Sequence, residues 1–543
     1  MNNNYKVCIL TAGAGTRMGF LSNFVNKAVL PVNFKAIISY ITEKFPENIE
    51  IVIGVGHKKE SVIDYLSIAH PERKFTFVEI DKYVGPGTGP GYSLLQCKNH
   101  LQCPFIFSSA DTIVLEEVPA PNENWFGIAP VRETEQYCTV KIKNNLVYQL
   151  DDKIKTDNKF AFIGLAGIRD YETFWQALEK SKNSGAGEFR DIIGFKALIE
   201  KRLVPNGFTW FDTGSLNNYQ ETNKNFSGGE KNFDFSKVGR NTEFLYFVNN
   251  KVIKYFSDID IAKKRCERAK LLKGLCPDIE FHKGNFYSYK KVEGDTLYNS
   301  LNVQILRDFF HWSRSILWEK KKLTEPELEE FYKVCREFYY EKTKKRVESF
   351  HSDNNVFDSS NNINGISVPL LKDLLDKINW EYICKGVPVR FHGDYKFGNI
   401  LVTRDKLSQL QKFILLDWRQ DFGGLIKYGD IYYDLAKLYA GIILSDELIK
   451  SGMFSFDMSG SSVYYDYHSK SRLMEAKEEY ELFLKESGFD IYKVKIIAAL
   501  SFLNMSPLHN YPFNFMVYYL GKSILHKTLM QPELNEKQSI KNV

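Results

Sequence analysis

The stretch "LTAGAGTRMG" (residues 10–19) decides the fold of the N-terminal half, because it follows the apolar run "YKVCIL" (5–10) without a break. An apolar run that ends in closely spaced glycines predicts a strand and a turn whose backbone amides can bind phosphate. Further apolar runs at 49–56, 74–80 and 104–111 alternate with helix-like segments at 32–45, 58–69 and 91–101. This alternation predicts a Rossmann-like α/β domain over residues 1–225, with a mostly parallel sheet and helices on both faces.

The residues after the glycine turn distinguish between two kinds of nucleotide. A dinucleotide-binding fold needs an acidic residue about twenty positions on, but the next strand ends in "HKKE" near residue 57. Cations follow the turn instead, Arg17 and then Lys27 in "NKAVLPV". They favour a triphosphate, since the amides at Ala12, Gly13 and Gly15 would approach the phosphates while the cations neutralise a leaving pyrophosphate.

The segment "LTAGAGTRMG…NKAVLPV" resembles the signature of the sugar-phosphate and phosphocholine nucleotidyltransferases. "GPGTGPGYSLL" (85–95) resembles the base-side loop of that family, which implies nucleotide contacts from Thr88 and Gly89. "FSSADTIV" (107–114) and "TWFDTGS" (209–215) carry Asp111 and Asp212, which match the positions where the family holds Mg²⁺. In one departure, "PVNFKAII" replaces the Gly-x-Pro segment that often follows the Leu-Pro, and no role carries over to that segment.

A second set of motifs lies in the C-terminal half. "VRFHGDYKFGNILV" (389–402) carries Asp394 and Asn399, and "FILLDWRQDFGG" (413–424) presents Asp417 after another apolar strand. In phosphoryl transfer, one carboxylate accepts or orients the attacking hydroxyl, while an amide and a second carboxylate hold Mg²⁺ on the phosphates. These residue types are those that phosphoryl transfer needs, and the family resemblance described next implies an ATP-dependent phosphotransferase with Asp394 as the base.

This pattern resembles the aminoglycoside phosphotransferase and choline kinase family, the small-molecule branch of the protein-kinase fold. The resemblance implies an α+β domain with a small sheet lobe and a larger helical lobe. It implies that Lys254, on a hairpin over 243–256 with its turn at 249–250, binds ATP phosphates, and that Glu267 on the next helix pairs with it. "VEGDTL" (292–297) resembles the family's hinge segment.

The sequence also predicts roles for four further residues of this half. His392 is expected to be a packed, hydrogen-bonded residue that shapes the catalytic loop. Asp430 and Asp434, in "YGDIYYDLAKLY", are expected to cap a helix or hold that loop. Choline kinases usually carry an acidic residue two positions after the metal-binding aspartate, whereas this chain has Arg419. The substrate is therefore not expected to be simply choline. Two roles remain open for Arg419: it contacts an anionic or hydroxylated group of the substrate, or it has a structural role.

Composition bounds the class of protein. A chain of 543 residues with 44% hydrophobic and 26% charged residues predicts two globular domains. The Gly-, Lys- and Asn-rich segment 226–240 is expected to link them, with the second domain over 241–535 and a polar loop at 350–367. A net charge of +5 without a basic tract argues against nucleic acid. Eight scattered cysteines, no signal peptide and no run of 18 apolar residues predict a cytoplasmic location without membrane insertion.

A kinase makes a phosphate monoester, and a nucleotidyltransferase of this kind consumes one. The sequence therefore predicts a bifunctional enzyme that phosphorylates a small alcohol with ATP and Mg²⁺ and then couples the phosphate to CTP, for surface polysaccharide or headgroup assembly. The compact size of the first domain and its fusion to a choline-kinase-like domain favour an acceptor that resembles ethanolamine, serinol, choline or glycerol. An anomeric sugar kinase fused to a sugar-1-phosphate nucleotidyltransferase is the alternative, and an inactive regulatory domain is a lesser one. The sequence leaves the oligomeric state open.

Overall fold

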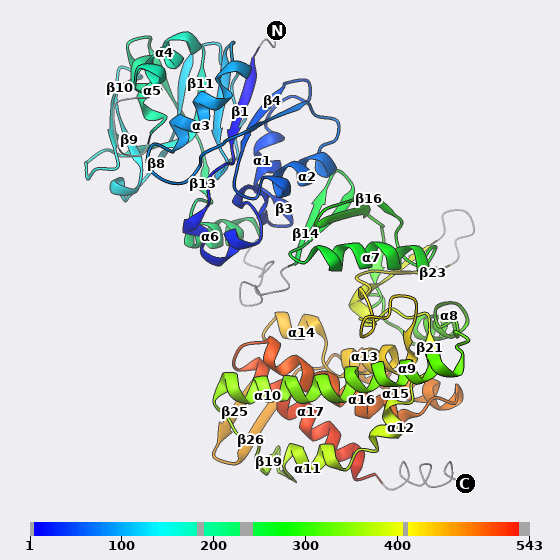
Figure 1. Cartoon of the computed structure of the whole chain (residues 1–543). Coiled ribbons are helices and arrows are strands. Elements are labelled where there is room, and N and C mark those ends of the chain that lie inside the picture. The colour runs from blue at the N-terminus through cyan, green and yellow to red at the C-terminus, as the bar shows by residue number, and fades with distance from the viewer. Residues whose placement is uncertain (1–4, 182–188, 228–242, 405–410, 532–543) are drawn as a thin grey trace. The chain divides into compact units, whose positions relative to one another are not determined.

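The computed structural model describes residues 5–181, 189–227, 243–404 and 411–531, which separate into two compact units (Figure 1). Of these residues, those up to 227 together with 243–259 and 280–291 form unit 1, and 260–279 together with 292 onward form unit 2. The sequence predicts that the second domain begins at residue 241. In the structure the hairpin 243–256 instead belongs to the same unit as the N-terminal residues. Nearly all of the expected linker, from 228 onward, lies outside the described residues.

The large sheet of unit 1 is parallel on one side and antiparallel on the other. Its main path runs β10-β9-β11-β6-β1-β4-β5, with β8 and β12 added beside β11. The pairs within β6-β1-β4-β5 are parallel and confirm the expected strands, whereas β11 pairs antiparallel with β6, β8 and β9. The strands of this sheet are β1 (Lys6–Leu10), β4 (Ile51–Val55), β5 (Phe75–Glu79), β6 (Phe105–Ser109), β8 (Asn124–Pro130), β9 (Cys138–Lys143), β10 (Leu146–Asp152), β11 (Phe160–Ile168) and β12 (Leu203–Gly207).

Both faces of the central strands are covered, as a parallel sheet requires. Cys8 belongs to an apolar core formed with α3, α4 and α5, while its neighbours Val7 and Ile9 are also fully buried and, by strand alternation, face the other side. Two short pairs, β2 (Pro31–Val32) with β3 (Lys35–Ala36) and β7 (Thr112–Val114) with β13 (Trp210–Asp212), complete the strands around this sheet. The helices of unit 1 are α1 (Ile37–Thr42), α2 (Lys59–Ala69), α3 (Pro90–Cys97), α4 (Tyr171–Ser181), α5 (Ile192–Ile199) and α6 (Leu216–Phe226).

A second, antiparallel sheet belongs to unit 1 and lies beside α2 (Figure 1). Its order is β14 (Glu243–Val248), β15 (Lys251–Phe256), β17 (Phe286–Lys290) and β16 (Ile279–Lys283). The hairpin turn at Asn249 and Asn250 is confirmed, since both have positive φ (48° and 59°), as a two-residue type I′ turn requires. Asparagine tolerates this conformation better than most residues, which explains why the pair occupies the turn.

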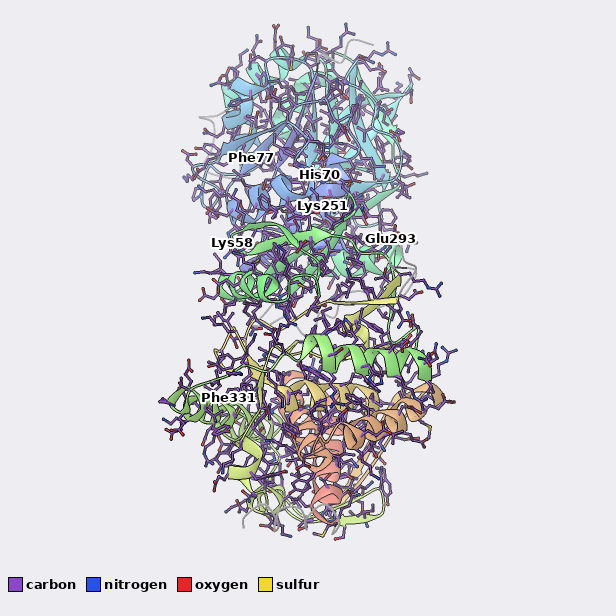
Figure 2. The ribbon with its side chains drawn as sticks, turned by 90° about the vertical axis from the view of Figure 1, so that its right-hand side faces the viewer. Lys58, His70, Phe77, Lys251, Glu293 and Phe331 are labelled. Carbon is purple, nitrogen blue, oxygen red and sulfur yellow. The ribbon has the colours of Figure 1, made fainter. Side chains whose placement is uncertain are left out.

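Side chains of the second sheet fasten it to the rest of unit 1. The hydroxyl of Tyr246 donates to Val29 O (2.9 Å), and that of Tyr255 donates to Phe24 O (2.5 Å). Lys251 donates to Ile68 O near the end of α2 (3.2 Å), and Figure 2 shows Lys251 close to His70, the residue after this helix. The sheet is therefore part of the core of unit 1 and touches the segment that carries Lys27.

Tyr246→Ala is expected to destabilise unit 1 by about 3–5 kcal/mol, because Tyr246 is fully buried and its ring lies 4.9 Å from that of Tyr65. Tyr246→Phe keeps the ring and loses one hydrogen bond, so about 1 kcal/mol is expected. Amide hydrogen exchange of α2 and residues 27–30 measures the effect. Unchanged exchange there in the alanine variant would contradict this packing.

Unit 2 combines small sheets with a larger set of helices, and it matches the expectation of a mainly helical second half. Its helices are α7 (Ile259–Leu271), α8 (Val303–Trp312), α9 (Glu325–Arg336), α10 (Lys342–Asn354), α11 (Leu371–Asp376), α12 (Trp380–Cys384), α13 (Ile431–Ile443), α14 (Asp446–Lys450), α15 (Ser471–Glu486), α16 (Ile491–Met505) and α17 (Phe513–Leu529). Its strands are β18 (Asp295–Thr296), β19 (Asn361–Ile363), β20 (Ile366–Val368), β21 (Pro388–Val389), β22 (Ile400–Arg404), β23 (Gln411–Leu415), β24 (Gly429–Asp430), β25 (Phe454–Ser459) and β26 (Ser462–Tyr467).

The prediction of a loop over 350–367 is partly wrong. Helix α10 continues to Asn354, and the strands β19 and β20 form a hairpin inside the segment. Strand β19 also pairs in parallel with β26, about a hundred residues further on. The Asn- and Ser-rich composition is typical of a loop and hid this hairpin, whose second partner, β26, is distant in sequence.

One helical stretch of the described residues, 491–508, is long and apolar enough by length and composition to cross a membrane, with a mean hydropathy of 1.2. It comprises α16 and the turn that follows, and 61% of it is buried. Helix α16 packs against α13 and α17, the usual environment of a core helix.

Candidate active sites

A buried asparagine fixes the backbone at the start of the glycine turn after β1. The side-chain amide of Asn26 donates to Thr11 O and His57 O, both at 2.7 Å, and Asn26 is fully buried. Gly15 has φ 66°, a conformation that favours glycine. Within the described residues, the backbone amides of Gly13, Ala14 and Gly15 have no hydrogen-bond acceptor. A turn with free amides suits an anion such as phosphate.

Asp111 lies just after β6 and forms a close ion pair with Lys27, Nζ to Oδ2 at 2.5 Å. The hydroxyl of Ser109 donates to the other carboxylate oxygen. Burial works to raise the pKa of Asp111, but the charge and hydrogen bond of Lys27, with smaller contributions from Ser109 and Arg17, lower it to about 2. Asp111 is therefore ionised at neutral pH and available as a metal ligand.

Asp212, at the end of β13, is fixed by three donors. Its carboxylate accepts hydrogen bonds from Gly214 N (2.7 Å), Asn218 Nδ2 (2.6 Å) and Tyr137 OH (3.1 Å). Burial, with a contribution from the charge of Asp111, raises the pKa of Asp212. Two carboxylates that disfavour each other's charge are typical of a cation site.

Gly214 marks the point where these groups converge. A Cβ atom placed on Gly214 would lie 3.0 Å from Asp212 Oδ1, 3.1 Å from Asp111 Oδ2 and 3.4 Å from Arg17 Nη2. Glycine leaves this space open between two carboxylates and a guanidinium. The structure thus brings together Arg17, Lys27, Asp111 and Asp212, which the sequence places as far as 195 positions apart.

The predicted base-side loop is closed on itself and braced by a second segment. Thr88 donates through its hydroxyl to Gly85 O (2.7 Å), and its own carbonyl accepts from Phe189 N (2.9 Å). Gly91 N donates to Phe189 O (2.9 Å), and a Cβ on Gly91 would lie 2.9 Å from that same oxygen. The close backbone approach explains the glycine and fixes the loop that carries Thr88 and Gly89 against residue 189.

A pocket of about 600 Å³ is lined by the glycine turn, the base-side loop and both aspartates. The residues predicted for the N-terminal site that line it are Ala12, Gly13, Gly15, Arg17, Lys27, Thr88, Gly89, Asp111 and Asp212. Sequence reasoning missed another part of the lining, namely Tyr83, Gln136, Tyr137, Lys153, Phe162, Arg190, Asp191 and Trp210. The rings of Tyr137 and Trp210 pack edge to face, 5.4 Å apart, beside Asp212. Trp210 stands two residues before Asp212 in "TWFDTGS", whereas Tyr137 lies outside every motif described above, so only the fold shows that the two rings pack together.

Lys27→Met is expected to lower nucleotidyl transfer by roughly 10²–10³-fold, as for loss of a group that stabilises transition-state charge. The variant also removes the charge that lowers the pKa of Asp111, so that pKa is expected to rise. Pyrophosphate release measures the rate. Lys27→Arg keeps the charge and serves as the control, and equal rates for Met and wild type would contradict the role of Lys27.

In unit 2, Asp394 and Asn399 meet in one loop between β21 and β22. Asn399 Nδ2 donates to Asp394 O (2.9 Å) and to Asp394 Oδ2 (3.0 Å). Lys437 from α13 lies 2.8 Å from Asp394 Oδ1, and Lys396 lies 3.5 Å from Oδ2. Burial works to raise the pKa of Asp394, but Lys437 and Lys396 hold it well below its usual range. The sequence did not single out either lysine.

The main chain of this loop is held as the sequence predicted. Asp434 accepts from His392 N and Gly393 N, both at 2.7 Å, and Asp430 caps α13 by accepting from Tyr432 N (3.2 Å). His392 is fully buried, and burial lowers its pKa to about 4. Its Nδ1 accepts from Asp394 N (3.2 Å), so the proton sits on Nε2, which donates to Leu416 O (2.7 Å). His392 is thus a neutral packing residue.

Asp417 follows β23 with φ 55°, a left-handed conformation that aspartate tolerates better than most residues. The residue before it, Leu416, donates its backbone N–H to Asn399 O (2.8 Å). This bond ties the strand that ends at Asp417 to the loop that carries Asp394 and Asn399. The described residues contain no cluster of three or more His, Cys, Asp or Glu side chains that could hold a metal ion.

Lys254 and Glu267, the expected phosphate-binding pair, fall in different units. Lys254 is buried on β15 and forms an ion pair with Glu243 Oε1 (2.8 Å). On α7 the neighbour of Glu267, Arg268, is buried and donates to His392 O (3.2 Å) and to Phe391 O. The residue through which α7 supports the loop that carries Asp394 is therefore Arg268, which the sequence did not indicate.

Comparisons with known proteins concern the first two fifths of the chain. It is 30% identical over 231 residues to the bifunctional protein GlmU of Methanococcus vannielii, covering 39% of this chain and 54% of that protein. The chain thus spans about half the length of the curated relatives it matches. No protein-family model matches it.

Two solved structures cover the same share of the chain. The CTP:phosphocholine cytidylyltransferase of Streptococcus pneumoniae has a TM-score of 0.33 and 21% identity, covering 41% of this chain and 98% of that one. The UDP-glucose pyrophosphorylase of Acinetobacter baumannii has a TM-score of 0.34 and 16% identity, covering 41% and 93%. The N-terminal two fifths of the chain resembles sugar-phosphate and phosphocholine nucleotidyltransferases, and the C-terminal half has no assigned relative among these matches.

Proposed function

We propose that the chain is a bifunctional enzyme in which unit 2 phosphorylates a small alcohol with ATP and unit 1 couples the resulting phosphate monoester to CTP. The observation that carries the proposal is the convergence of Asp111, Asp212 and Arg17 on the open space at Gly214, beside a glycine turn with free amides. Such an arrangement can bind a triphosphate and stabilise charge on a leaving pyrophosphate. The match to nucleotidyltransferases over this part of the chain agrees with it.

In the proposed nucleotidyl transfer, an oxygen of the phosphate monoester attacks the α-phosphorus of CTP. A new P–O–P linkage forms, the bond between the α-phosphorus and its bridging oxygen to the β-phosphate breaks, and pyrophosphate leaves. Lys27 and Arg17 neutralise charge on the phosphates, while the amides of Gly13 and Gly15 fix their position. Trp210 Nε1 is buried in the pocket wall without a partner in the described part of the chain, which leaves it as a donor for the acceptor phosphate.

The donor sets fit Mg²⁺, which proteins bind through one or two carboxylates together with substrate phosphates. Asp111 and Asp212 would hold the ion in unit 1, and Asn399 and Asp417 would hold it in unit 2. When bound, Mg²⁺ supplies positive charge to the phosphates. A site of two carboxylates also explains why no cluster of three acidic or imidazole ligands is found among the described residues.

In the proposed phosphorylation, the alcohol oxygen attacks the γ-phosphorus of ATP. The bond from the γ-phosphorus to the bridging oxygen breaks, ADP leaves, and the hydroxyl proton passes to the carboxylate of Asp394. The lysines at 437 and 396 keep Asp394 ionised, and Asn399 holds its orientation. The support is geometric: the acid, the amide and the loop bond to the strand before Asp417 lie together in one site.

The test uses the full chain with ATP, Mg²⁺, each of the four nucleoside triphosphates and a panel of alcohols, with products read by mass spectrometry. A CDP-linked alcohol is expected, formed from the free alcohol only when ATP is present. Supplying the phosphorylated alcohol should remove the need for ATP. A nucleotide-linked hexose from UTP or GTP would overturn the assignment of both base and acceptor.

A further inference from the structure

Unit 2 carries a group of cations that the phosphoryl transfer described above does not use. Lys342 and Arg346 lie one turn apart on α10, and Arg419 lies two residues after Asp417. The ring of Phe338 brings two of them together, because Lys342 Nζ lies 4.1 Å and Arg419 Cζ 5.3 Å from its centre. We call Lys342, Arg346 and Arg419 the cation cluster.

The cluster lies next to the catalytic loop. A Cβ atom on Gly393, the residue before Asp394, would lie 2.5 Å from Arg419 Cβ, so the stem of Arg419 packs directly on this loop. The backbone N–H of Arg419 donates to His392 O (3.0 Å). The charge of Lys437, which contacts Asp394, also acts on Lys342. An acceptor alcohol held at Asp394 would therefore meet the cluster.

No carboxylate of the described residues forms an ion pair with the cluster. Within the described residues, no carboxylate lies at ion-pairing distance from Lys342, Arg346 or Arg419, and the buried Nε of Arg419 has no hydrogen-bond partner. Asp421 acts on Lys342 from a distance and is itself paired with Lys264 (3.1 Å). Burial and the neighbouring cations lower the pKa of Lys342 to about 7, which reflects an environment poor in negative charge.

A pocket borders the cluster and has room for a ligand. Its volume is about 710 Å³, and its lining is Glu337, Glu341, Lys342, Lys345, Arg346 and Ser349. The two glutamates do not pair with the cluster, and Glu337 is exposed. The neighbouring stretch Glu337–Glu341 is a short π-helical segment between α9 and α10. Such distortions of an α-helix are found frequently at functional sites.

We propose that the cation cluster binds an anionic group of the acceptor, so that unit 2 phosphorylates an alcohol that carries a carboxylate or a phosphate. This inference rests on the proposed phosphotransferase function and narrows its substrate class. Arginine binds such planar or tetrahedral oxyanions through paired N–H donors, and lysine adds charge. A cationic alcohol such as choline would be repelled by the same residues.

The test compares probes that differ in charge on one carbon skeleton: D-glycerate, sn-glycerol 3-phosphate and glycerol, with choline as the cationic probe. Binding to the full chain is measured by calorimetry without ATP, and phosphorylation by ADP release. One or both anionic probes are expected to bind at least about tenfold more tightly than glycerol, and which of them does so separates carboxylate from phosphate recognition. Arg419→Gln should weaken binding of the preferred anionic probe by at least about tenfold more than it weakens binding of glycerol.

Matched variants separate the cluster from general charge effects. Arg419→Lys should restore part of the binding, and Lys344→Gln, an exposed lysine on the same helix, should have no effect. Arg346→Gln repeats the test at a half-buried position if Arg419→Gln does not fold. Anionic probes that bind no better than glycerol or choline, or an equal loss for all probes in Arg419→Gln, would overturn the proposal.

The two readouts keep this proposal distinct from the function beneath it. Binding of an anionic probe that depends on Arg419, without ADP release from any alcohol, would contradict the kinase assignment and uphold the anion site. Phosphorylation of choline or glycerol that is as efficient as that of the anionic probes, with no probe affected by Arg419→Gln, would uphold the kinase and refute the anion site.

Discussion

Asp111→Asn is expected to lower pyrophosphate release by at least about 10²–10³-fold while ADP release stays at the wild-type level. The substitution removes one of the two carboxylates that converge on Gly214 and leaves Lys27 without its partner at 2.5 Å. A phosphate monoester should accumulate when ATP and the alcohol are supplied. Parallel assays of pyrophosphate and ADP, with mass spectrometry of the monoester, measure all three effects.

The matched control for this variant is Asp157→Asn, which neutralises an exposed aspartate of unit 1. It should leave both activities unchanged. If Asp111→Asn retained full pyrophosphate release, the site around Gly214 would not be the centre of nucleotidyl transfer. If it abolished ADP release as well, the two activities would not be separable, and one shared site would have to be considered.

Asp394→Asn is expected to lower ADP release by roughly 10²–10⁴-fold, the usual contribution of a positioned general base. The amide cannot accept the hydroxyl proton, and it loses the ion pairs to Lys437 (2.8 Å) and Lys396 (3.5 Å). Formation of the nucleotide-linked product from the free alcohol should stop. It should resume when the phosphorylated alcohol is supplied, because unit 1 is intact.

Asp376→Asn, an exposed aspartate at the end of α11, is the control for charge loss in unit 2. Retention of ADP release in Asp394→Asn would mean that unit 2 is not a phosphotransferase of the proposed kind. Together with Asp111→Asn, this variant also tests the alternative of an inactive regulatory domain. In that case only one of the two variants would change any activity.

Local patterns in the sequence singled out residues that the structure gathers in the pocket of unit 1. The strands at 6–10, 51–55 and 105–109 are strongly apolar and end in polar or glycine residues, so their type and the edge they share could be predicted. Asp111 and Asp212 fall at strand ends, where the fold gathers functional groups. Asn26 could not be predicted in the same way, because its role depends on burial against His57 and Thr11, which no spacing reveals.

Other features depend on contacts between distant segments. The local sequence predicts the hairpin at 243–256, but it does not show which part of the protein the hairpin packs against. Glu267 and Arg268 are adjacent, yet side chains one position apart on a helix differ by about 100° in direction. An uncertainty of one residue in helix register therefore decides which of them reaches the loop that carries Asp394, and the structure gives Arg268.

The sheet formed by β14, β15, β17 and β16 has a consequence for how such a protein can be divided. By sequence it belongs with the second half, but its tyrosines bond to the backbone at Phe24 and Val29 in the first. A gene fragment ending at residue 227 would leave the buried ring of Tyr65 uncovered, and one starting at 243 would carry the sheet without its support. The two halves of the chain therefore cannot be exchanged independently. A recombination event between them would have to keep the contacts of this sheet with residues 24–29 and Tyr65, or replace them.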